Sequence, residues 1–69
     1  MKLSARNQLK GMVLSIQKGA TTSHVSIELV GGAVVMASIT NEAVADLGLV
    51  VGQPAVAVIK ASDVMVGVE

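Results

Sequence analysis

The chain has 69 residues, no cysteine and no aromatic residue, and its five Lys/Arg and five Asp/Glu give a net charge of zero. These features exclude disulfides and thiolate metal sites. They also argue against nucleic-acid binding, which depends on a basic surface and, for single strands, on aromatic stacking. Because 52% of the residues are apolar and the mean hydropathy is +0.72, we expect so small a domain to bury surface by self-association.

Direct metal ligation and membrane insertion have little support in the sequence. One histidine and five scattered carboxylates show no metal-ligand spacing. No apolar run reaches the roughly 18–20 residues of a membrane span. Arg6 and Lys10 fall where the apolar part of a signal peptide would lie. We therefore expect a soluble, cytoplasmic protein whose residues 1–69 form one domain.

The first part of the chain predicts two strands. Residues 3–10 are predicted to be an extended lead-in, and Gly11 to be a break or a bulge. Apolar and polar residues alternate over 11–17 and again over 24–29, with a turn at 18–22 between them. The second of these strands is expected to have one polar face.

A hairpin and a third strand follow. Gly31 and Gly32 predict a tight turn, since adjacent glycines readily supply the positive φ that primed turns need. Residues 34–39 are apolar at nearly every position. We therefore expect both faces of this strand to be covered.

A short helix is predicted over 42–47. Thr40 or Asn41 would cap its N-terminus. Glu42 lies in the first turn, where the helix dipole favours an acidic side chain, and Gly48 suits the left-handed position at the C-terminus.

The last part of the chain predicts two more strands. A turn at 52–54 leads into a strand over 55–60, and a short connection at 61–63 leads into a final strand over 64–68. The order β-β-β-α-β-β is that of an all-β, OB-like five-stranded Greek-key barrel with one short helix. Because several strands are apolar on both faces, one face is expected to line the barrel and the other to meet a neighbouring subunit.

Polar chemistry is concentrated near the N-terminus. Residues 4–11, SARNQLKG, place a hydroxyl, a guanidinium, two amides and an ammonium close together. A tetrahedral oxyanion presents only acceptors, so its site needs donors, positive charge and no carboxylates. We predict that this segment binds such an anion together with a second cluster near Lys60. The alternatives are a surface salt bridge from Arg6 to Asp46 or Asp63, and a solvated strand end for Lys60.

Four segments carry a family resemblance: SARNQLKG at 4–11, ASIT at 37–40, LGL at 47–49 and VIKASDVM at 58–65. They are similar to the molbindin, or Mop, family of small molybdate-binding proteins, whose domain recurs in molybdate-responsive regulators and molybdate transporter ATPases. The resemblance covers essentially the whole chain. It implies an OB-like fold with strand exchange between paired subunits, assembled into a hexamer as a trimer of dimers. It also implies cytoplasmic storage of molybdate, with tungstate as an analogue, for molybdenum homeostasis, and no organic cofactor.

The resemblance also implies a set of ligands. In the family, the main site lies at a subunit interface and uses the Ser and Arg of the SARN motif, a Thr after the third strand, and a Lys-Ala pair after the fourth. The corresponding residues, with the small Ala5 between the first two, are Ser4, Arg6, Thr40, Lys60 and Ala61. Ala43 stands where the regulator relatives have a serine, so one hydroxyl donor is absent. Asn41 or a water molecule could replace it.

The turn after the first predicted strand is a candidate second anion site. The family has a second class of site on its threefold axis. Lys18, Gly19 and Thr22 could form a donor-rich nest for such an anion. The alternative is a solvated hairpin turn.

Catalysis has no support in the sequence. The lone His24 lies in a predicted strand without a Ser/Asp constellation, and there is no cysteine nucleophile. We therefore expect a binding protein and not an enzyme. Two alternatives remain: a ligand-sensing regulatory module that acts through a partner protein, and a purely structural OB-like oligomer without a small ligand. The first is expected to carry a fused DNA-binding or ATPase segment, and none is recognisable.

Overall fold

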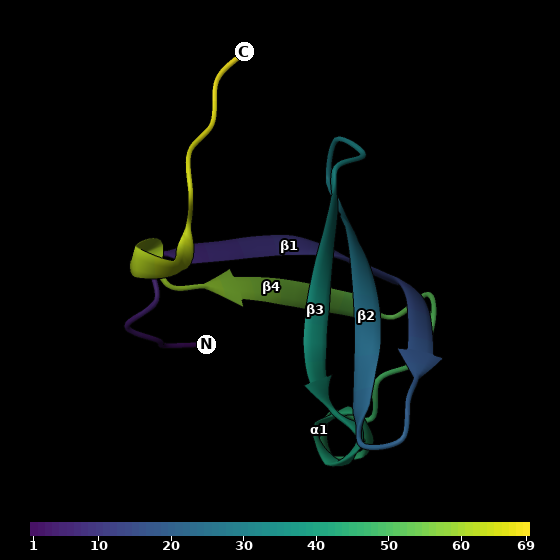
Figure 1. Ribbon diagram of the computed structural model, residues 1–69. Coiled ribbons are helices and arrows are strands. Elements are labelled where there is room, and N and C mark those ends of the chain that lie inside the picture. The colour runs from purple at the N-terminus through teal and green to yellow at the C-terminus, as the bar shows by residue number, and fades with distance from the viewer.

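The computed structural model describes all residues, Met1–Glu69, as four strands, one α-helix and one short 3-10 helix. In chain order these are β1 (Asn7–Lys18), β2 (Thr22–Leu29), β3 (Val34–Thr40), α1 (Asn41–Leu47), β4 (Pro54–Ile59) and the 3-10 helix η1 (Ala61–Asp63). The strands form one antiparallel sheet in the order β3-β2-β1-β4 (Figure 1). No helix is long and apolar enough to cross a membrane.

The long strand β1 pairs with two other strands. Its first half pairs with β4 and its second half pairs with β2. The β1–β2 register shifts between Val13 and Ser15, so that Leu14 forms a β-bulge. Bulges bend a strand and increase its twist. In Figure 1, β1 accordingly runs along β4 and then turns to continue beside β2.

Gly11 is not a break in the chain, as the sequence predicted, but an interior residue of β1. It is paired with Leu29 on one side and Ala55 on the other. A Cβ atom built at this position would collide with the carbonyl group of Glu28 and with the side chain of Ile27. Close approach of a neighbouring backbone, and not a turn, therefore explains the glycine.

The predicted turn and caps are confirmed. Gly31 and Gly32 have φ values of 101° and 98° in the hairpin between β2 and β3. The Thr40 hydroxyl accepts a hydrogen bond from the Ala43 N–H at 3.0 Å and caps α1. Gly48, with φ of 62°, ends the helix in the left-handed conformation.

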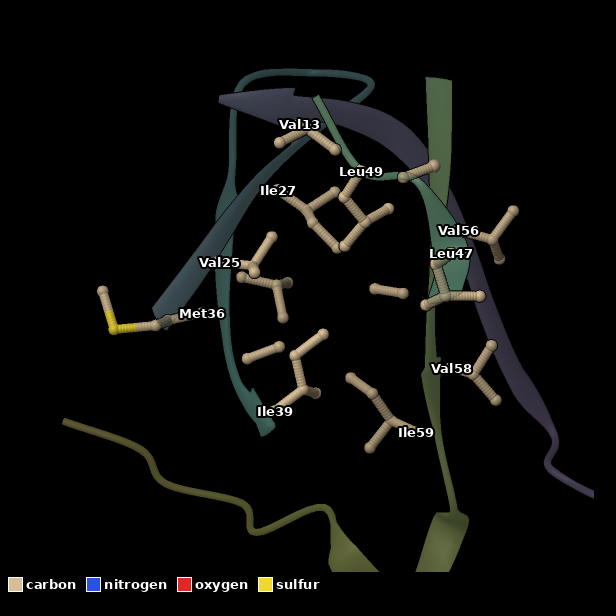
Figure 2. A pocket seen from close by; sticks show the side chains of 14 residues that line it. Val13, Val25, Ile27, Met36, Ile39, Leu47, Leu49, Val56, Val58 and Ile59 are labelled. Carbon is tan, nitrogen blue, oxygen red and sulfur yellow. The ribbon is translucent and has the colours of Figure 1, made fainter. Parts of the chain in front are cut away.

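The hydrophobic core is small. Only four apolar side chains are buried, and they are Val13, Val25, Ile27 and Ala57. Beside them the curled sheet encloses a cavity of about 430 Å³, lined entirely by hydrophobic residues. Ile39 of β3 and Ile59 of β4 point into this cavity from the two edge strands (Figure 2). The single chain therefore forms a curled sheet with an unfilled gap between β3 and β4.

The predicted strand over 64–68 is wrong for the single chain. After η1 the chain runs away from the sheet without pairing (Figure 1). Met65, Val66 and Val68 are 94%, 90% and 95% exposed. The expectation that both faces of β3 are covered is also wrong within one chain, because the outward-facing Met36 is exposed. Both edges of the sheet and an apolar tail are thus left without a partner.

Candidate functional site

Two cations leave the sheet side by side at one end of the β1–β4 ladder. The last pair of this ladder is Asn7 with Ile59, so Arg6 directly precedes β1 and Lys60 directly follows β4. Opposite residues of antiparallel strands lie about 5 Å apart at Cα. Both cationic side chains are exposed. The ladder therefore brings together the two charges that the sequence singled out from segments more than fifty residues apart.

Side chains around these cations are oriented by backbone contacts. The Asn7 Nδ2 donates to the Ile59 carbonyl at 3.2 Å and fastens the start of β1 to the end of β4. The Gln8 Nε2 donates to the Ala5 carbonyl at 3.2 Å. None of the side-chain hydrogen bonds of the chain involves Arg6 or Lys60. The two cations therefore keep all their donors free.

Further donors flank the pair. Ser4 lies exposed two residues before Arg6, and its hydroxyl makes no hydrogen bond within the chain. Ala61 opens η1, and its N–H donates to no backbone carbonyl. The structure thus gathers five of the six predicted ligands at this end of the ladder, and they are Ser4, Ala5, Arg6, Lys60 and Ala61.

Thr40, the sixth predicted ligand, ends β3 on the opposite edge of the sheet. No strand pairing or hydrogen bond joins it to Arg6 or Lys60. Its hydroxyl accepts the Ala43 N–H, and a hydroxyl that accepts one hydrogen bond still has its own proton to donate. Within one chain Thr40 is therefore an available donor that stands apart from the other five.

Asn41 does not replace the donor that is absent at Ala43. Both N–H groups of its amide have acceptors, because Nδ2 donates to the carbonyls of Gly19 at 3.1 Å and Ala20 at 3.3 Å. Its Oδ1 accepts from the Ser23 hydroxyl at 2.6 Å. The sequence suggested Asn41 as a substitute ligand, and the hydrogen bonds show it to be a structural link between α1 and the β1–β2 turn.

A polar depression of about 440 Å³ lies where β1 turns into β2. Its lining contains no hydrophobic residue and no carboxylate, and consists of Gln17, Lys18, Gly19, Thr22 and His24. The predicted second cluster, Lys18 with Gly19 and Thr22, is therefore brought together. Gln17 and His24 were missed, although they are direct partners in the β1–β2 ladder. Only the strand register reveals that they share this face.

Thr40 lies beside the polar depression, across the β2–β3 ladder. Thr22, which lines the depression, is the direct partner of Thr40 in the β2–β3 ladder. Directly opposed residues have Cβ atoms about 4.5–5.5 Å apart. No group of three or more His, Cys, Asp or Glu side chains could hold a metal ion.

Known proteins share this sequence and this fold. The TOBE domain family matches residues 3–66. A probable molybdenum-pterin-binding protein of Haemophilus influenzae is 52% identical over 69 residues, which cover 100% of both chains. The structure of MopII from Clostridium pasteurianum is 40% identical, with a TM-score of 0.91 over 97% of this chain and 100% of its own.

The structure of ModG, a cytoplasmic molybdate-binding protein solved with molybdate bound, is 49% identical with a TM-score of 0.95. It matches 100% of this chain, which covers 49% of the ModG chain. These likenesses confirm the predicted OB-like fold class. Since the family spans nearly the whole chain and a full-length relative shares 52% of its positions, the chain belongs to the TOBE-domain family, among the small Mop-type molybdenum-pterin-binding proteins.

Proposed function

We propose that the protein binds molybdate, with tungstate as an analogue, in sites that two copies of the chain complete together. The observation that carries the proposal is the pair of unpaired cations, Arg6 and Lys60, at the end of the β1–β4 ladder. Two cations that leave neighbouring backbone positions repel one another when both turn inward, and a dianion between them offsets this repulsion. The guanidinium offers a planar fork of donors and the ammonium a compact charge.

The neighbouring groups suit the same ligand. Ser4 supplies a hydroxyl, Ala61 a free N–H, and the small Ala5 lets the backbone approach the anion closely. None of these residues carries a carboxylate, a group that would repel an oxyanion. A dianion facing two cations is nearly neutralised, so its partial burial is tolerable. The proteins similar to this chain are named for binding molybdate or molybdenum-pterin, which supports the choice of anion.

Self-association follows from the same geometry. In our proposal Thr40 comes from a second copy, because within one chain it stands on the opposite edge strand from Lys60. The unpaired edges of β3 and β4 are templates for strand pairing. The exposed tail over 64–68 has the alternating valines that such a strand needs. Exchange of this strand between paired subunits, and a trimer of such dimers, would cover both the edges and the apolar outer faces.

The biological role we infer is storage and homeostasis of molybdenum in the cytoplasm. The whole chain, 1–69, would act as one binding domain and not as an enzyme. A second anion would bind at the depression around Lys18, Gly19 and Thr22, where two of the groups offer an ammonium and a hydroxyl. All protein contacts to the anion would run through its oxygens, with no direct bond from the protein to the metal.

Calorimetric titration with molybdate, tungstate, sulfate and phosphate tests the proposal. We expect molybdate and tungstate to bind and the two smaller anions to bind more weakly. A ligand that joins subunits also raises the melting temperature. Absence of heat and of any melting shift with all four anions would leave a structural oligomer as the function.

A further inference from the structure

Asn41 ties the start of α1 to the turn between β1 and β2. Its Nδ2 donates to the carbonyl oxygens of Gly19 at 3.1 Å and Ala20 at 3.3 Å. Its backbone N–H donates to the carbonyl of Thr21 at 2.9 Å. One residue therefore fixes three successive carbonyl groups of this turn.

Ser23 holds the Asn41 side chain from the interior. This serine is 1% exposed, and its hydroxyl donates to Oδ1 of Asn41 at 2.6 Å. A partly buried polar pair of this kind restricts both side chains to one arrangement. Since both N–H groups of the Asn41 amide already have acceptors, the amide has no donor for an anion. Asn41 can act on ligand binding only through its neighbours.

Candidate ligands of both proposed anion sites lie next to Asn41. Thr40 directly precedes Asn41 and is held by its cap contact to the N–H of Ala43. Lys18 and Thr22 flank the turn that Asn41 fixes, and both line the polar depression. Thr22 and Thr40 are moreover direct partners in the β2–β3 ladder. A displacement of the turn is therefore passed to Thr40 by the ladder and by Asn41.

We propose that Asn41 is a positioning residue that couples the polar depression to the site containing Thr40. The inference rests on the proposed function. An anion that contacts Lys18 and Thr22 holds the β1–β2 turn in one conformation. Through its hydrogen bonds to this turn, Asn41 then holds the start of α1 and the adjacent Thr40 in place. An anion in the depression therefore raises the affinity of the site containing Thr40, because it stabilises the arrangement that this site needs. Since coupling between two binding sites is reciprocal, an anion at that site raises the affinity of the depression by the same factor.

A double-mutant cycle with molybdate as the probe tests this coupling. Calorimetry measures the affinity of the molybdate site that Arg6→Ala weakens. It is applied to the wild type, Lys18→Ala, Asn41→Ala and the double variant. Lys18→Ala is expected to lower the affinity for molybdate about fivefold or more when Asn41 is present. In the Asn41→Ala background it should lower the affinity no further. A purely structural Asn41 predicts independent effects whose fold-changes multiply, and that result would overturn the coupling.

Ser23→Ala is the second variant, for use if Asn41→Ala does not fold. It removes the contact that orients the amide and leaves the turn contacts in place. The effect of Lys18→Ala should shrink in this background, and an undiminished effect contradicts the coupling. A wild-type protein that binds no molybdate refutes the proposed function itself. Binding with multiplicative fold-changes refutes only the role of Asn41.

Discussion

The side-chain amide of Asn7 donates a hydrogen bond to the carbonyl oxygen of Ile59 at 3.2 Å, across a sequence separation of 52 residues. This contact closes the β1–β4 ladder immediately before Arg6 and Lys60 diverge. It limits how far apart the two cations can move. Asn7 thus shapes the proposed site although its amide donates to the backbone.

Asn7→Ala should therefore weaken molybdate binding without removing a ligand. Loss of one neutral hydrogen bond corresponds to about 1 kcal/mol, or roughly fivefold in affinity. Titration calorimetry measures the change. Ser38→Ala is the control, because it also truncates a polar strand residue but on β3, away from the ladder end. Equal affinities for the two variants would show that the Asn7 contact does not matter for the site.

Arg6→Ala and Lys60→Ala should each remove a charged donor. We expect each to weaken molybdate binding by about 1.5–3 kcal/mol, the scale of a hydrogen bond to a charged group. Because both side chains are exposed and make no hydrogen bond in the chain, stability should change little. Lys2→Ala, another exposed cation near the N-terminus, is the control. Unchanged affinity in both site variants refutes the assignment of these ligands.

Local signals in the sequence predicted local structure correctly. The cap at Thr40, the glycine turn at 31–32 and the left-handed Gly48 each depend on residues within a few positions. The bulge at Leu14 and the packing of Gly11 depend instead on how β1 pairs with two other strands. Strand register is set by contacts distant in sequence, and a shift of one residue exchanges the two faces.

The candidate site likewise has features that residue types predicted and features that depend on strand pairing. The donor-rich segment before β1 was evident from residue types, and a role together with Lys60 was predicted. The β1–β4 ladder shows how the two segments come to lie side by side. Gln17 and His24 were missed because only the β1–β2 register shows that these two strand residues face the depression together with Lys18 and Thr22. Asn41 was considered, beside a water molecule, as a possible substitute ligand because a free amide and a bonded amide look the same in a sequence.

Gly11→Ala should destabilise the fold, because the added methyl group meets the backbone of Glu28. Overpacking of this kind costs about 1–3 kcal/mol, which lowers the melting temperature by several degrees in a small domain. Thermal unfolding followed by circular dichroism measures the shift. Ser38→Ala is the control, since it alters an exposed strand residue of β3 without adding an atom. Similar melting temperatures for the two variants would contradict the close approach.

Val66→Asp tests whether the exposed tail joins subunits. Val66 is 90% exposed in the single chain, so a charge there costs nothing if the tail stays in solvent. If the tail instead fills the gap between β3 and β4 of a neighbouring copy, the aspartate would be buried or placed against apolar residues, which is strongly unfavourable. We therefore expect light scattering after size-exclusion chromatography to show a smaller assembly, and molybdate binding to weaken with it. Val30→Asp, at a hairpin residue that is 89% exposed, controls for the added charge. An unchanged mass for Val66→Asp would mean that the assembly does not depend on the tail.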